Sequence, residues 1–313
     1  MRIAFFGTPA FAVPTLDALL GSAHHVVLVV TQPDRPRGRG QRVSTGPVKQ
    51  LAQARGIPVL QPETLTRDRW EAEFARFNID LGVVAAYGKI LPDWLLALPR
   101  LGLINVHASL LPRYRGASPI HRALMNGDPE TGVTIMRVVK ALDAGAMLAT
   151  ATVPIAPDDR TDMVERKLAD VGGALLVETV DRLAGGPVAE VPQREAEATY
   201  APRLRKEEGL VDWTRPARAI HDQIRGLQPW PHAFTFAPAG RLILHRSSVA
   251  AGPVHDAAPG TVVAASQSEG LRVATGDGML DLLELQAEGG KVLPARVFLA
   301  GHPLKPGDRL GAV

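Results

Sequence analysis

The fold is decided first by residues 1–30, which read MRIAFFGTPAFAVPTLDALLGSAHHVVLVV. Arg2–Phe6 and Val26–Val30 are short apolar runs, as expected of buried strands, and Val13–Leu20 between them has the spacing of an amphipathic helix. A strand, a helix and a second strand in this order indicate a parallel sheet, because parallel neighbours need a crossover connection. Gly7 interrupts the apolar run, so we interpret it as a buried first strand rather than a signal peptide.

The same alternation continues to about residue 187. Further candidate strands are Leu81–Ala85, Leu103–His107 and Thr134–Val138, and further candidate helices are Pro47–Arg55, Trp70–Phe77, Pro119–Met125 and Thr161–Leu183. We therefore predict an α/β domain over residues 1–187, with a mostly parallel sheet covered by helices.

The sequence changes character after residue 187. Residues 188–206 lack periodicity and hold scattered prolines and charges, which predicts a linker. From there on, short alternating runs are separated by Gly, Pro and Asp turns, which is typical of a small β-barrel, here over residues 207–313. Its candidate strands are Ala233–Phe236, Leu242–His245, Gly260–Ala264, Leu271–Ala274 and Met279–Leu285, preceded by a helix near Pro216–Gly226.

Composition excludes several classes of protein. The 313 residues are 46% hydrophobic and 21% charged, which is ordinary for a globular chain. There is no cysteine, so disulfide scaffolds, thiolate nucleophiles and Cys-ligated metals are excluded, and a reducing cytoplasm is the expected location. No apolar run approaches the roughly 18 residues of a membrane span, so we expect no membrane partner.

Positive charge is concentrated in residues 31–49, which read TQPDRPRGRGQRVSTGPVK. The segment has five basic residues against one acidic residue, a net charge of +4, whereas the whole chain carries +3. Three Gly and three Pro predict a long exposed loop, disordered without a ligand. It is either a solvated surface loop or an arm whose arginines meet nucleic-acid phosphates.

A second polar motif lies in residues 102–128, which read GLINVHASLLPRYRGASPIHRALMNGD. Asn105 and His107 are two apart on a candidate strand, so their side chains leave the same face, at the carboxyl end where open α/β sheets bind ligands. The backbone of the turn Ser109–Pro112 can be recognised by a flat heterocycle. Asp143, in the sequence LDAG, follows the next strand and lies beside His107 if the two strands are neighbours.

These three side chains suit acyl transfer to an amine. An α-amino group has a pKa of about 7.7–8.0, so much of it is neutral and needs no activated serine. Asn105 can donate to the oxyanion, His107 can donate or move a proton, and Asp143 can orient the imidazole. Structural roles are the alternative, since each could be a turn or strand-end residue, and the Asn-x-His pair alone favours that alternative.

Other chemistries fit less well. A nicotinamide dehydrogenase needs Gly-x-Gly-x-x-Gly, and FGTPAF has one glycine. Neither Ser109 nor Ser118 lies in a Gly-x-Ser-x-Gly elbow. The nine histidines form no metal-binding motif, so no metal is expected.

Taken together, the motifs resemble a known family. HASLLPRYRGASPI with LDAG is similar to the 10-formyltetrahydrofolate-dependent transformylases. VTQPDRPRGRG, RKEEGLVDW, GLQPWPHAF and LLELQAEGGKVLPARVFLAG narrow the resemblance to the methionyl-tRNA formyltransferases, over nearly the whole chain. The resemblance implies a Rossmann-like catalytic domain, a C-terminal OB-like barrel that helps hold tRNA, and formyl transfer from 10-formyltetrahydrofolate to methionyl-initiator tRNA. Nothing in the sequence requires more than a monomer, which is the expected state.

The resemblance also implies roles for individual residues. The catalytic residues are Asn105, His107 and Asp143; the folate-binding residues are Ser109, Leu110, Leu111 and Pro112 with Tyr87, Gly88 and Ile90; the tRNA-binding residues are Arg35, Arg37, Arg39 and Arg42. The chain has Gln41-Arg42 where members often have two lysines, so the role of each loop charge stays open. Two alternatives remain: a formyltransferase for a small amine such as glycinamide ribonucleotide or an amino sugar nucleotide, and a catalytically silent tRNA- or folate-binding protein.

Overall fold

The computed structural model describes residues 1–37, 42–251 and 256–311. It divides into two compact units, each considered by itself. Unit 1 consists of Met1–Pro119, Thr131–Pro154 and Glu165–Ala201, and unit 2 of Ile120–Glu130, Ile155–Val164 and the chain from Pro202 onward. In the described residues, no helix is long and apolar enough to cross a membrane.

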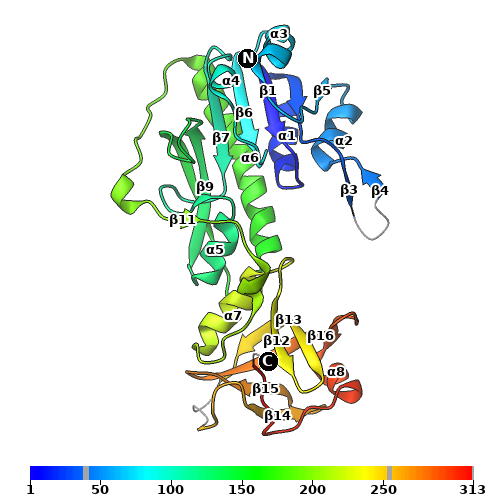
Figure 1. The fold of residues 1–313 in the computed structure, drawn as a ribbon. Coiled ribbons are helices and arrows are strands. Elements are labelled where there is room, and N and C mark those ends of the chain that lie inside the picture. The colour runs from blue at the N-terminus through cyan, green and yellow to red at the C-terminus, as the bar shows by residue number, and fades with distance from the viewer. Residues whose placement is uncertain (38–41, 252–255, 312–313) are drawn as a thin grey trace. The chain divides into compact units, whose positions relative to one another are not determined.

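Unit 1 is built on a seven-stranded sheet of order β10-β9-β7-β6-β1-β2-β5 (Figure 1). The strands are β1 (Arg2–Gly7), β2 (His25–Val30), β5 (Val59–Leu60), β6 (Leu81–Ala85), β7 (Leu103–His107), β9 (Glu130–Arg137) and β10 (Met147–Pro154). Strands β5, β2, β1, β6 and β7 pair in parallel, and β9 is antiparallel to β7. The prediction of a mostly parallel sheet is confirmed.

Helices cover both faces of this sheet. They are α1 (Ala12–Leu20), α2 (Pro47–Ala54), α3 (Arg67–Ala75), α4 (Asp93–Leu96) and α6 (Thr161–Gly185), while α5 (Pro119–Met125) lies mostly in unit 2. Phe74 of α3 and Leu95 of α4 are buried against Phe6 and Leu103, on the face that also carries Asn105 and His107. On the opposite face, α6 packs closely at Gly172 against Val106 and Val133. Each face of the sheet is therefore covered by helices, as the sequence predicts.

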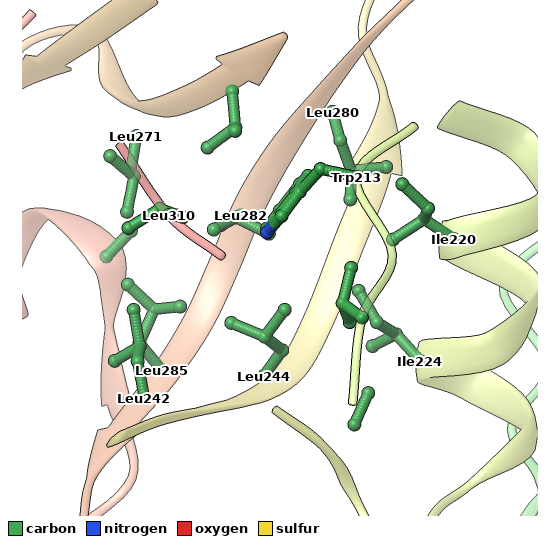
Figure 2. Close-up of a cluster of buried hydrophobic side chains, with 14 of the residues drawn as sticks. Trp213, Ile220, Ile224, Leu242, Leu244, Leu271, Leu280, Leu282, Leu285 and Leu310 are labelled. Atoms are coloured by element: carbon green, nitrogen blue, oxygen red, sulfur yellow. The ribbon is translucent and has the colours of Figure 1, made fainter. Parts of the chain in front are cut away.

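Unit 2 contains an antiparallel sheet of order β12-β13-β16-β15-β14, with β17 paired to β16. Its elements are α7 (Ala217–Gly226), β12 (Ala233–Ala237), β13 (Gly240–Val249), β14 (Val262–Ser266), β15 (Gly270–Ala274), β16 (Met279–Ala287), β17 (Leu293–Pro294) and α8 (Ala295–Gly301). Figure 2 shows Trp213 and leucines of these strands packed against Ile220 and Ile224 of α7. In the described residues the sheet is consistent with an OB-like barrel that does not close, because its edge strands β12 and β14 do not pair with each other. Isolated bridges join Gly311 to Phe236 of β12 and Arg309 to Thr261 beside β14.

The structure corrects two expectations about connecting segments. The stretch 31–49 is not all loop, because β3 (Arg35–Arg37) and β4 (Arg42–Ser44) form an antiparallel hairpin. Both strands of this hairpin are edge strands, which tolerate a proline such as Pro36. The stretch 188–206 is not a free connector either. It forms a short helix at Glu195–Glu197 and the strand β11 (Tyr200–Ala201), and its residues up to Ala201 belong to unit 1.

Candidate active site

Strand β7 places the first two polar side chains at its carboxyl end. Asn105 pairs with Val84 of β6 and with Met136 of β9, so it lies in the middle of the sheet. His107 is 5% exposed, whereas Asn105 is only partly buried. The Asn105 carboxamide has no hydrogen-bond partner among the residues that the structure describes, so its N–H groups are available to a ligand.

The hydrogen bond of His107 defines which ring nitrogen is available. Nε2 lies 3.0 Å from the main-chain oxygen of Tyr114. Because a carbonyl only accepts, Nε2 carries the proton of the neutral ring and Nδ1 keeps its lone pair. Nδ1 lies 3.7 Å from Oδ2 of Asp143, too far for a hydrogen bond but close enough for a charge interaction. A proton accepted at Nδ1 therefore faces a carboxylate.

Asp143 reaches this position from the connection between β9 and β10. Its carboxylate Oδ2 accepts a hydrogen bond of 2.8 Å from the N–H of Gly116, and its side chain is 18% exposed. Its φ of +47° is a left-handed conformation that is uncommon outside glycine. The expectation that Asp143 lies beside His107 if their strands are neighbours agrees with the structure, since β7 and β9 pair directly.

The turn Ser109–Pro112 is fixed by a residue that sequence reasoning missed. Thr134, the β9 partner of His107, donates from Oγ1 to the oxygen of Ser109 at 2.7 Å and accepts from the N–H of Leu111 at 3.1 Å. Ser109 also donates from Oγ to the oxygen of Arg113 at 2.6 Å. The sequence marks Thr134 only as the start of a candidate strand, because no local pattern reveals a hydroxyl that bonds a turn 25 residues away.

We expect Thr134→Val to lower the free energy of unfolding by about 2–6 kcal/mol, because two buried backbone groups lose their partners at about 1–3 kcal/mol each. Denaturant titration measures this change. Thr131→Val is the matched control, since Thr131 is also buried on β9 and its hydroxyl bonds none of the described residues. Equal losses in the two variants would contradict this role of Thr134.

In the expected wall of the folate pocket, Tyr87 is buried, whereas Gly88 and Ile90 are exposed. Tyr87 is 1% exposed, its ring packs edge-on against Phe6 at 5.7 Å between centroids, and burial raises the pKa of Tyr87 to about 12. Its carbonyl accepts from Nε2 of Gln32 at 2.8 Å. Gly88 has a φ of +77°, and a Cβ there would lie 2.7 Å from the same Gln32 nitrogen. Ile90 is 92% exposed.

The basic segment is anchored at its base. Asp34 bonds Lys49 and accepts from Nε2 of Gln61 at 3.1 Å, and the hydrogen bond from Lys49 lowers the pKa of Asp34. Since Asp34 and Lys49 neutralise each other, the +4 charge belongs to the four arginines. Arg35 is exposed on β3, Arg37 pairs with Arg42 across the hairpin, and Arg39 lies outside the described residues.

Comparison with known proteins decides the family. Residues 1–180 match the family described as formyl transferase, and residues 203–303 match the formyl transferase C-terminal domain. The methionyl-tRNA formyltransferase of Citrifermentans bemidjiense is 48% identical over 311 residues, covering 99% of this chain and 96% of its own. That of Methylobacillus flagellatus is 47% identical over 313 residues and covers both chains completely. The chain belongs to the methionyl-tRNA formyltransferase family.

As a member of this family the chain is a formyltransferase, with a Rossmann-like α/β domain followed by an OB-like domain. A solved structure, HypX from Aquifex aeolicus in complex with tetrahydrofolic acid, superposes with a TM-score of 0.62 at 18% identity. It covers all of this chain and 51% of that one, and at this identity it shows a shared fold.

Proposed function

We propose that this chain transfers the formyl group of 10-formyltetrahydrofolate to the α-amino group of methionyl-initiator tRNA, in the cytoplasm and as a monomer. The observation that carries the proposal is the pairing of His107 Nδ1 with the Asp143 carboxylate, beside an Asn105 amide with no partner among the described residues. Nearly full-length similarity to methionyl-tRNA formyltransferases supports the acceptor.

The proposed reaction balances without a covalent enzyme intermediate. The neutral amine attacks the formyl carbon, a C–N bond forms, and the carbonyl oxygen becomes an oxyanion to which Asn105 donates. The ammonium proton passes to Nδ1 of His107, whose positive charge faces Asp143. The bond from the formyl carbon to N10 then breaks and N10 gains a proton, so no net proton is consumed.

We also assign the folate and tRNA sites to residues described above. We assign the pterin to the backbone of the Ser109–Pro112 turn, fixed by Thr134, with the exposed Gly88 and Ile90 and the buried Tyr87 as the facing wall. Arg35, Arg37, Arg39 and Arg42 are assigned to the acceptor end of the tRNA, where they meet phosphates. Binding should therefore weaken steeply with salt.

We expect Asp143→Asn to lower kcat roughly 10²–10⁴-fold, because the imidazolium formed at His107 loses its carboxylate. The asparagine side chain keeps an oxygen for the Gly116 N–H, so folding should be preserved. Single-turnover formylation at saturating co-substrate measures the effect. Wild-type turnover in this variant would remove Asp143 from the proposed mechanism.

The function itself is tested by incubating the chain with 10-formyltetrahydrofolate and methionyl-initiator tRNA and measuring formylmethionyl-tRNA. A small-amine acceptor, such as glycinamide ribonucleotide or an amino sugar nucleotide, is assayed in parallel. The +4 segment and the second domain argue against such an acceptor, which requires neither. Folate binding without any formylated tRNA would contradict the proposal.

A further inference from the structure

Residues Val191–Ala201 form a strap across unit 1, drawn in yellow-green in Figure 1. The strap begins at Val191, which exchanges two main-chain hydrogen bonds of 2.8 and 2.9 Å with Met147 at the start of β10. It ends at β11, which pairs in parallel with β8 (Arg115–Gly116). Both attachments lie next to the catalytic residues, because Met147 follows the Asp143 loop and Gly116 donates to Asp143.

Gln193 connects the strap to the catalytic loop, residues 138–146, which carries Asp143 between β9 and β10. Its Nε2 donates 2.8 Å hydrogen bonds to the main-chain oxygens of both Asp143 and Gly145. Its Oε1 accepts a 3.0 Å bond from Nε of Arg115. Both N–H groups and the oxygen of the carboxamide are therefore engaged, which fixes the orientation of the side chain.

Arg115 holds Gln193 in that orientation. The Arg115 side chain is 3% exposed, and its Nη1 bonds both carboxylate oxygens of Glu195 at 3.1 and 2.9 Å. Its main-chain N–H donates to the main-chain oxygen of Thr199 at 2.9 Å, so the strap binds Arg115 on two sides. Gln193 is thus supported by a buried guanidinium rather than by solvent.

The catalytic loop needs such support. Asp143 has a φ of +47°, a conformation that costs of order 1–3 kcal/mol for a residue other than glycine and persists only when neighbours enforce it. Gly145 passes so close to Arg137 that a Cβ would lie 1.9 Å from the Arg137 oxygen. The loop is therefore held at its carboxylate by Gly116 and at its main chain by Gln193.

We propose that Gln193 is a positioning residue: by binding the main-chain oxygens of Asp143 and Gly145, it fixes the Asp143 carboxylate opposite Nδ1 of His107. The inference rests on the proposed function for its kinetic consequence. Gln193 touches no reacting atom in this scheme and acts only through Asp143.

Kinetics of Gln193→Leu provide the first test. We expect kcat to fall roughly 10–100-fold, because a catalytic group misplaced by about 1 Å can cost on the order of 10²-fold, with little change in KM for either substrate. Gln193→Glu is the second variant, since it keeps the acceptor for Arg115 and loses both N–H donors. Glu197→Gln is the matched control, because Glu197 lies on the same strap and pairs with Arg194 at the surface. A wild-type kcat in both Gln193 variants would overturn the proposal.

A double-mutant cycle separates positioning from general support. In an Asp143→Asn background, Gln193→Leu should cost less than about twofold in kcat, because the group it positions has already lost its charge. If the kcat losses of the two single variants multiply in the double variant, Gln193 does not act through Asp143 and the proposal is wrong.

Amide hydrogen exchange tests the contact without any activity measurement. Exchange over residues 138–146 should rise in Gln193→Leu and Gln193→Glu and stay at the wild-type level in Glu197→Gln. Unchanged exchange in both Gln193 variants would overturn the proposal. If the wild-type chain formylates no tRNA, the proposed function fails, while the exchange result still decides whether Gln193 holds this loop.

Discussion

Replacing His107 by alanine is expected to lower kcat/KM for formylation roughly 10²–10⁴-fold. A loss of this size is typical when a proton acceptor or a group that stabilises the oxyanion is removed. His107 is 5% exposed, its Nε2 is tied to Tyr114, and its Nδ1 faces Asp143 at 3.7 Å. The Asp143 carboxylate is also bonded to the main-chain N–H of Gly116, a group that cannot accept a proton in place of the imidazole. Single-turnover formylation of methionyl-tRNA measures the loss.

His25→Ala is the matched control for this variant, because His25 is an exposed histidine at the start of β2 in the same unit. Thermal unfolding of both variants checks that the fold is retained. Wild-type turnover in folded His107→Ala would contradict the enzymatic role of this histidine and favour a silent tRNA- or folate-binding protein.

Deleting residues 35–42 is expected to abolish formylation of methionyl-tRNA and to leave folate binding intact. Arg35 and Ser44 are hairpin partners, so the cut ends lie side by side and a short Gly-Ser bridge can join them. The Asp34–Lys49 pair at the base is kept. The deletion removes all four arginines, and the salt dependence of tRNA binding should fall by about one in slope for each phosphate that the variant no longer binds.

The control for this deletion replaces the four arginines by glutamine and keeps the hairpin length. Filter binding at several salt concentrations measures affinity and slope for both variants. Loss of tRNA affinity in the deletion alone would assign the effect to shape rather than charge. Wild-type formylation in the deletion would contradict the assignment of this segment to tRNA.

The elements that sequence predicts best are those with a long apolar run or a complete helical face. Strands β1, β2, β6 and β7 and helix α6 follow from such patterns. The edge strands β5 and β10 escape sequence prediction, since β5 has two residues and β10 mixes buried, intermediate and exposed positions. A Gly- and Pro-rich composition predicts a loop where a hairpin forms, because two short antiparallel strands satisfy each other's backbone groups.

Some residues of the candidate site can likewise be predicted from the sequence, and others cannot. Asn105 and His107 can be predicted together because they are two apart on one strand, and Asp143 follows once its strand is taken as a neighbour. Thr134 and Gln193 cannot be predicted, because each acts on backbone atoms far away in sequence. The burial of Tyr87 also appears only in the structure: the residue is 1% exposed, and its ring packs against Phe6 in the core.

The initial rate of formylation of initiator and elongator methionyl-tRNA, measured side by side with 10-formyltetrahydrofolate as the donor, tests the central claim most directly. We expect rapid formylation of the initiator and much slower formylation of the elongator, because the proposed function assigns Arg35, Arg37, Arg39 and Arg42 to the acceptor end of the initiator tRNA. Equal rates on the two tRNAs would contradict initiator specificity. Absence of formylated tRNA, with folate bound or a small amine formylated instead, would contradict the proposed function itself.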